Sequence, residues 1–145
     1  IRDLPLYNHD VDADFPATAR ELKARIEGSD ALLFVTPEYN RSIPGALKNA
    51  IDWASRPWGK NSFSGKPCAV IGGSIGAIGT AIAQSHLRVV MGFCAAPMMG
   101  QPEGYLTITP ELIADDGQVT VDSTRKFLAG YMQSFAAFVA GSLGT

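Results

Sequence analysis

Several features that define protein classes are scarce in this sequence. It has two cysteines, Cys68 and Cys94, which are too few for a disulfide scaffold, and no close pair of Cys or His residues that begins a zinc site. No apolar run approaches the roughly 20 residues that a membrane-spanning helix needs. The first residues have no basic stretch followed by an apolar run, so we do not expect them to be a signal peptide. These absences exclude disulfide-rich, zinc-ribbon and membrane-spanning proteins. They favour a cytoplasmic protein with reduced thiols.

A basic run is also missing. The chain has 12 Lys and Arg against 14 Asp and Glu, which gives a net charge of −2. Phosphate binding needs clustered basic side chains, so we expect no nucleic-acid partner. Hydrophobic residues make up 46% of the 145 residues and charged residues 18%, which excludes a disordered chain. With no repeat and no linker, residues 1–145 are expected to form a single domain.

Helical and strand patterns alternate along the chain. Continuous apolar runs at 31–35 and 67–71 predict strands that are covered on both faces, as in parallel sheets. A third short strand is predicted at 93–98. Helices are predicted at 16–28, at 43–55 with Ser42 as its N-cap, at 77–91 and at 122–140. This alternation is typical of an α/β fold with a doubly wound parallel sheet.

Two loops follow predicted strands at the edge where open α/β sheets bind ligands, residues 36–42 and 72–79. The second loop is rich in glycine and leads into a helix, so its amides could face an anion or a polar ring edge. Ser74 stands where the dinucleotide fingerprint has glycine, and no Gly-Lys-Ser/Thr ends the loop as in a P-loop. By itself this loop is equally compatible with a tight strand-to-helix turn.

The first loop is more specific. Thr36-Pro37-Glu38-Tyr39-Asn40, followed by the Ser-Ile-Pro-Gly-Ala-Leu-Lys-Asn-Ala-Ile-Asp-Trp stretch at 42–53, resembles the NADPH-dependent FMN reductase family of flavodoxin-like quinone and chromate reductases. The resemblance continues at 65–67, 72–74, 84–88 and 101–103, and it covers nearly all of the chain.

The resemblance implies a noncovalently bound FMN. It places Pro37, Glu38, Tyr39 and Asn40 along the isoalloxazine ring, largely through main-chain groups, with Ser42 capping the helix below. It places Gly73, Ser74 and Gly76 at the pyrimidine end of the ring. Amides in these positions stabilise the negative charge that develops as the ring accepts a hydride. No catalytic side chain and no metal ligand is expected.

One part of the family pattern is not found. The family begins with a strand and a Gly-Ser-x-Arg-x-x-Ser loop that binds the FMN phosphate, whereas this sequence starts at Ile1 without such a segment. We therefore expect a flavodoxin-like sheet that lacks its first strand, helix and strand. The strand at 31–35 should then have an unpaired edge.

The expected activity is that of an FMN-dependent oxidoreductase. Hydride passes from NADPH or NADH to FMN, and two electrons then pass to a quinone, flavin, chromate or similar small acceptor. The sequence leaves open which nicotinamide cofactor and which acceptor are used. Two alternatives are a flavodoxin-like electron carrier and a flavin-free interaction domain.

The helices at 43–55 and 77–91 are apolar around much of their circumference, which predicts a homo-oligomer. The resemblance adds that dimers pair into tetramers, in which Arg88 and Glu103 meet across subunits. Trp53 is expected in the core or at a subunit contact. Trp58 is expected either in the flavin pocket or at a subunit interface.

Overall fold

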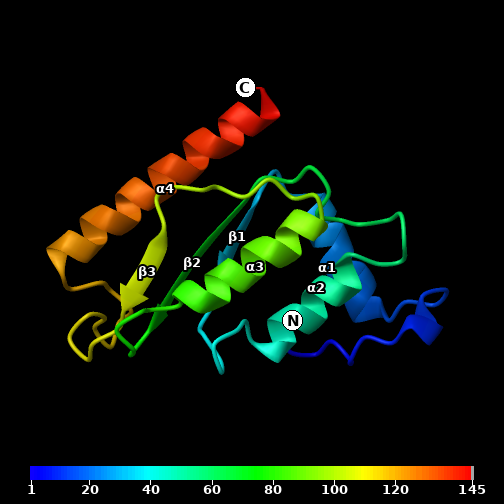
Figure 1. Cartoon of the computed structure of the whole chain (residues 1–145), viewed down its shortest axis with the longest axis horizontal. Helices are drawn as coiled ribbons and strands as arrows, with labels where there is room; N and C mark the ends of the chain where they lie inside the picture. Colours follow the sequence, from blue (N-terminus) through cyan, green and yellow to red (C-terminus); the bar gives the residue numbers. More distant parts are fainter. Residues whose placement is uncertain (145) are drawn as a thin grey trace.

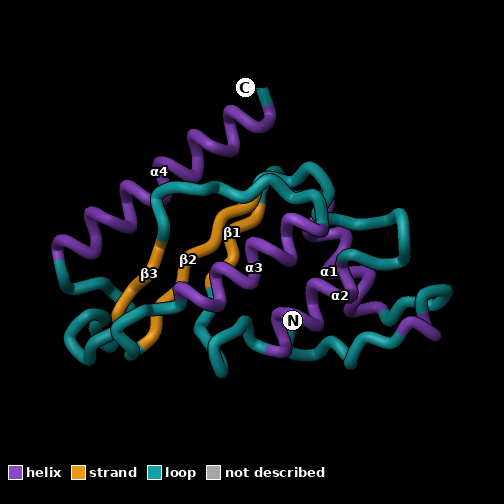
Figure 2. Tube along the Cα trace, in the orientation of Figure 1, coloured by secondary structure: helices purple, strands orange, loops and turns teal. Residues whose placement is uncertain are grey.

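The computed structural model describes residues 1–144, which form a three-stranded parallel sheet with helices on both faces (Figures 1 and 2). The strand order is β1-β2-β3. No helix of the described residues is long and apolar enough to cross a bilayer. The elements in chain order are a 3-10 turn His9–Val11, α1 Ala17–Glu27, β1 Leu32–Val35, α2 Gly45–Ala54, β2 Cys68–Ser74, α3 Ala81–Phe93, β3 Gly104–Thr107 and α4 Asp122–Leu143.

The two faces of the sheet bury different side chains of the central strand β2. Cys68 and Val70 face α2 and α3, where they join a cluster that includes Ile51 and Leu87. Ala69 and Ile71 point the other way, toward a cluster built by Tyr131 and Phe135 of α4. The alternation follows from strand geometry, in which successive side chains leave opposite faces. The predicted α/β fold with a doubly wound parallel sheet is confirmed.

The N-terminal segment packs against the far side of α2. Trp53 is fully buried there, with Tyr7 and Phe15 in edge-to-face contact at centroid distances of 5.1 and 5.0 Å. Its indole Nε1 donates a 2.7 Å hydrogen bond to the carbonyl of Pro5. Of the two places predicted for Trp53, the core and a subunit contact, the structure shows the core.

The predicted third strand at 93–98 is wrong. Phe93 is the last residue of α3, and Ala95 adopts a left-handed φ of 55°, which turns the chain out of the helix. Met98 makes one isolated parallel bridge with Cys68, and the third strand β3 forms later, at Gly104–Thr107. Gly104 pairs with Ile71, whose side chain lies 2.5 Å from where a Cβ on Gly104 would stand. The strand reaches this position because glycine has no Cβ.

Ser42 does not cap α2. The helix begins later than predicted, at Gly45, with Pro44 before it and no side-chain capping hydrogen bond. The reason is that Ser42 belongs to a tight turn, in which its backbone pairs with Tyr39. Its hydroxyl shares a 3.0 Å hydrogen bond with Nδ1 of His86 on α3. The α3 helix also begins later than predicted, at Ala81.

Within residues 1–144, β1 pairs with β2 alone and is an edge of the sheet, as predicted. Its residues are half-buried, and Val35 is exposed, although its apolar run predicted cover on both faces. A hollow of about 250 Å³ lies beside it, lined by β1 residues together with α1 and α2 side chains such as Ile26 and Leu47.

Candidate functional site

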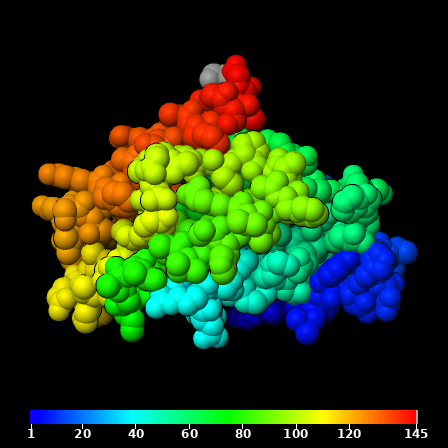
Figure 3. Space-filling model, viewed as in Figure 1, coloured from blue at the N-terminus to red at the C-terminus, as the bar shows by residue number. Residues whose placement is uncertain are grey.

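The two loops singled out in the sequence meet at the carboxyl ends of β1 and β2. In Figure 1 the segment 36–44 (cyan) and the segment 75–80 (green) both lie along the lower edge of the sheet. Figure 3 shows the same two segments exposed next to each other on the surface. The structure therefore brings together the two groups of predicted residues, Pro37–Asn40 and Gly73–Gly76, at the edge where parallel sheets bind ligands.

The first loop is a tight turn. The backbones of Tyr39 and Ser42 exchange two hydrogen bonds of 3.0 and 2.9 Å. Asn40 and Arg41 form its tip, with left-handed φ values of 49° and 63°. Asparagine tolerates this conformation better than most residues, whereas Arg41 is strained in it. The turn leaves the Tyr39 ring exposed at the edge of the sheet where the two loops lie.

Glycines let the second loop pass close to its neighbours. A Cβ on Gly73 would stand 2.6 Å from the side chain of Ile108. Ser74 shapes the turn that follows, since its hydroxyl accepts a 3.1 Å hydrogen bond from the amide of Gly76. Ser74 and Gly76 are thus bonded to each other, which sequence reasoning did not foresee.

Several amides of the two loops have no partner. Within residues 1–144, no acceptor faces the backbone N–H of Asn40, Ile75 or Ala77. Unpaired amides at a strand end suit the polar edge of a planar ring that carries carbonyl oxygens and ring nitrogens. The arrangement fits a flavin. Among the same residues, no three His, Cys, Asp or Glu side chains are grouped to hold a metal ion.

Glu38 points away from the open edge and into α3. Its Oε2 accepts hydrogen bonds of 3.0 Å from the backbone amides of both Ile82 and Ala83. Its Oε1 accepts one of 3.1 Å from Nη1 of Arg41. The hydrogen bond from Ala83 is the main reason that the pKa of Glu38 lies below its usual value, with Arg41 adding to it. Glu38 is a half-buried residue, and both oxygens of its carboxylate accept hydrogen bonds.

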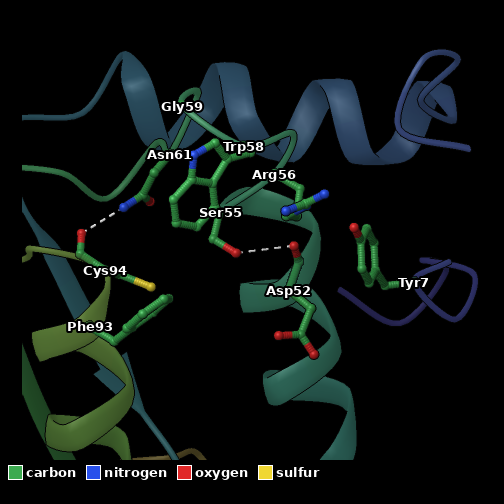
Figure 4. A pocket seen from close by; sticks show the side chains of 9 residues that line it. All are labelled: Tyr7, Asp52, Ser55, Arg56, Trp58, Gly59, Asn61, Phe93 and Cys94. Carbon is green, nitrogen blue, oxygen red and sulfur yellow. Dashed lines mark hydrogen bonds between the residues drawn. The ribbon is translucent and has the colours of Figure 1, made fainter. Parts of the chain in front are cut away.

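One large hollow lies away from the two loops. The hollow drawn in Figure 4, of about 590 Å³, is at the far end of α2 from the two loops. Trp58 on the loop after α2, 80% exposed, and Phe93 at the end of α3, 81% exposed, are among its lining residues. Because α2 runs back along the sheet from the loop that contains Asn40, Trp58 lies away from the two candidate loops of its own chain.

The remaining reactive side chains are engaged in the fold. Burial raises the pKa of the Cys68 thiol to about 12, so this cysteine is not a nucleophile at neutral pH. Cys94 is also buried and its pKa is raised for the same reason. Arg88 donates a 2.7 Å hydrogen bond to the Met99 carbonyl of its own chain, and Glu103 accepts one of 2.7 Å from the Tyr105 hydroxyl.

Comparison with known proteins decides the family. The family model for NADPH-dependent FMN reductase matches residues 1–110. The chain belongs to this family. It is 54% identical over 139 residues to the 2-hydroxy-1,4-benzoquinone reductase of a Burkholderia species, a match that covers 96% of this chain and 76% of that protein. It is 42% identical over 140 residues to the NAD(P)H-dependent FMN reductase of Pseudomonas aeruginosa, covering 96% and 75% of the two chains.

A solved structure shows the same fold. The flavoenzyme FerB of Paracoccus denitrificans, an NAD(P)H:(acceptor) oxidoreductase, superposes with a TM-score of 0.92 at 50% identity, over 97% of this chain and 78% of that one. The fold is therefore flavodoxin-like. As a family member the protein is an FMN-dependent oxidoreductase with a nicotinamide cofactor as electron donor. Of the three functions considered from the sequence, this one is confirmed.

Sequence reasoning missed three contacts that join the loops. These are the Glu38 carboxylate on α3, the Ser42–His86 hydrogen bond and the close approach of Gly72 to Thr36. None has a local signal, because each joins residues at least 36 positions apart. The Gly72-Gly73 pair near the end of β2 is the one hint that another backbone comes close there.

Proposed function

We propose that this reductase passes two electrons from NAD(P)H to a quinone. The balanced reaction consumes NAD(P)H, one proton and the quinone, and it yields NAD(P)⁺ and the hydroquinone. Bound FMN supplies the hydride acceptor and then the two-electron donor. The acceptor class is supported by the Burkholderia relative, whose name specifies a benzoquinone.

One observation carries the proposal. The unpaired amides of Asn40, Ile75 and Ala77 come from two loops that meet at the carboxyl ends of β1 and β2. We propose that these loops hold the ring edge, with Pro37, Glu38, Tyr39 and Asn40 on one side and Gly73, Ser74 and Gly76 on the other. The unpaired amides of the two loops, those of Asn40, Ile75 and Ala77, stabilise negative charge on the ring and orient it. Ser42 acts indirectly, through the turn that it closes and through His86.

The test is anaerobic reduction of the FMN-loaded protein. Mixing it with NADPH, and separately with NADH, should bleach the visible flavin absorption band. Adding a benzoquinone should then restore the band and produce one equivalent of hydroquinone. Ping-pong kinetics is expected, because donor and acceptor use the same face of the flavin in turn. Double-reciprocal plots of initial rate against NAD(P)H concentration, at several quinone concentrations, should therefore give parallel lines. A flavin that NAD(P)H does not reduce at a useful rate overturns the enzymatic proposal.

We further propose that the protein is a homodimer built on α2 and α3. A mainly apolar hollow of about 510 Å³ lies between these helices, lined by residues that include Ile43, Lys48, His86, Val89 and Val90. Val89 is 73% exposed, and Phe93 one turn further along α3 is exposed as well. Apolar side chains gathered in this way on helix surfaces favour a partner surface.

A tetramer of two such dimers stays a prediction. Arg88 is half-buried and Glu103 is exposed. Both lie near Tyr105. Burial and the Glu103 carboxylate raise the pKa of Tyr105, whereas the Arg88 guanidinium lowers it. This places a cation and an anion together on one surface patch, which suits a contact with the same patch of a second dimer. Replacing Arg88 with Glu should reduce a tetramer to dimers.

The two free cysteines suit the reducing cytoplasm, which we propose as the location of the protein.

A further inference from the structure

The N-terminus of α3 lacks a cap from its own segment. The first amides of an α-helix have no acceptor inside the helix and need one from elsewhere. Thr80, which precedes α3, makes no side-chain capping hydrogen bond; its hydroxyl instead accepts a 2.8 Å hydrogen bond from Nε2 of Gln84. The cap comes from a distant residue, Glu38, whose Oε2 lies 3.0 Å from the amides of both Ile82 and Ala83.

A carboxylate in this position is favourable for two reasons. It accepts hydrogen bonds that are charge-assisted, and it faces the positive end of the helix dipole. Arg41 closes the arrangement from the other side, within the same turn. The Glu38 side chain is 6% exposed, so water competes little for these hydrogen bonds.

The position of Glu38 in the chain gives the cap a second effect. Glu38 belongs to the loop that follows β1, while Ile82 and Ala83 follow the glycine-rich loop after β2. The carboxylate therefore ties together the two loops that carry unpaired amides. The Ser42–His86 hydrogen bond makes a second tie between the same loop and α3, one helical turn further along.

We propose that Glu38 is a positioning residue for FMN: its carboxylate fixes the first loop on α3, so that the amides of both loops are set at the spacing that the flavin ring edge requires. This rests on the proposed flavin site. Both carboxylate oxygens are occupied by donors, so Glu38 holds the loop and does not transfer a proton to or from substrate. Pre-organisation of this kind raises affinity by removing the cost of ordering the loop on binding.

The experiment compares Glu38→Ala, Glu38→Gln and a control, Glu21→Gln. Glu21 is an exposed residue that pairs with Arg25 one helical turn away on α1. The dissociation constant of FMN is measured by quenching of flavin fluorescence. Glu38→Ala should raise it by about tenfold, the equivalent of one charge-assisted hydrogen bond. Glu38→Gln keeps an oxygen of the same reach and should raise it by less. Glu21→Gln should leave it unchanged.

Two further readouts separate positioning from other roles. At saturating FMN and NAD(P)H, the pH dependence of turnover in Glu38→Gln should have the same inflection points as in wild type, whatever the turnover number, since no proton transfer is lost. In the FMN-free protein, amide hydrogen exchange at Ile82 and Ala83 should become faster in Glu38→Ala. The exchange measurement needs no flavin, so it tests the tie even if the proposed function fails.

The proposal is overturned if Glu38→Ala binds FMN as tightly as wild type. It is also overturned if Glu38→Gln removes or shifts an inflection point of the pH profile of turnover, which indicates an acid or base, or if exchange at Ile82 and Ala83 does not change. A wild-type protein that fails to bind FMN overturns the proposed function instead. Should Glu38→Ala not fold, the Gln variant carries the affinity and turnover tests by itself.

Discussion

The carbonyl oxygen of Thr36 stands 2.1 Å from the point where a Cβ on Gly72 would lie. The end of β1 and the end of β2 thus approach more closely than any other residue at position 72 allows. The Thr80 hydroxyl is 2.6 Å from the same point, which brings the start of α3 to the same place. The starts of the two proposed flavin loops and of α3 therefore converge at Gly72.

Replacing Gly72 with Ala should force these backbones apart. Overpacking of this kind costs about 1–3 kcal/mol of the free energy of unfolding. FMN affinity should fall too, because the two loops separate. Gly130→Ala is the matched control: nothing lies within 4 Å of its Cβ position inside α4, so that variant should gain about 0.5–1 kcal/mol. Urea unfolding of both variants checks the prediction, and equal stability of the two contradicts it.

Asn40 offers a way to separate backbone from side chain at the tip of the first loop. Its left-handed φ of 49° suits glycine, so Asn40→Gly removes the side chain and keeps the turn. If the side chain hydrogen-bonds the ring, as the loop position suggests, this variant should lose about 0.5–1.5 kcal/mol of FMN binding at unchanged stability. Asn40→Ala should lose stability as well. Fluorescence titration and thermal unfolding measure the two effects, and full affinity in Asn40→Gly removes the side chain from the site.

The parts of the fold that the sequence predicted are those with a strong local pattern. The strands near 31–35 and 67–71 are continuous apolar runs, and the helices have clear periodicity. β3 was missed because it is four residues long, starts with a glycine and is only partly buried, so that its pattern is that of a loop. The segment at 93–98 is apolar but serves as a helix end, where Cys94 and Ala96 are buried without forming a strand.

The site was predictable to a similar extent. The Pro-Glu-Tyr-Asn motif and the glycine-rich loop indicated two loops at strand ends, and the structure brings these loops together; that they bind the flavin stays a prediction. The orientation of individual side chains was not predictable, since it depends on contacts between distant segments. Glu38 turns toward α3 because the first amides of that helix, at Ile82 and Ala83, need an acceptor from outside the helix. Ser42 turns toward His86 because the loop closes on itself before α2 begins.

Tyr131 should contribute to stability and not to activity. Its buried hydroxyl donates a 2.7 Å hydrogen bond to the carbonyl of Val70 in β2, linking α4 to the central strand. Tyr131→Phe should cost about 0.5–1.5 kcal/mol of the free energy of unfolding and leave FMN affinity unchanged. Tyr105→Phe serves as the comparison, because its hydroxyl bonds Glu103 at the surface, where water replaces the lost partner. Denaturant unfolding measures both, and a larger loss in Tyr105→Phe contradicts the assignment.

Asp12 should make part of the stability depend on pH. Burial by itself raises its pKa, but hydrogen bonds from Tyr7 and Arg56 outweigh that effect and leave the pKa below its ordinary value. His9 faces the same carboxylate at 3.3 Å. The folded state therefore holds the charged form, and its stabilisation is complete at neutral pH. It begins to disappear below the unfolded-state pKa of about 3.9 and is gone below the folded-state pKa.

Thermal unfolding across the acid range tests this dependence. Asp12→Asn should unfold at a lower temperature than wild type at neutral pH, and the difference should narrow as the pH falls through the acid range. Asp14→Asn is the control, since Asp14 is exposed two positions away along the chain. A constant difference between Asp12→Asn and wild type at all pH values contradicts the linkage.

The proposed dimer leads to the last prediction. Val89 and Phe93 lie on the exposed side of α3, and Trp58 lies near the end of that helix beside the hollow in Figure 4. A twofold axis across α2 and α3 brings the Trp58 end of one subunit toward the loop end of its partner, because the helices of the two copies then run in opposite directions.

Val89→Glu places a charge in the middle of this surface, where burial without a partner is costly. Sedimentation equilibrium should show a dimer mass for wild type and a monomer mass for Val89→Glu. Met132→Glu, at an exposed apolar position of α4 on the opposite face of the sheet, should remain a dimer. A wild-type monomer, or a dimer that tolerates Val89→Glu, contradicts the interface.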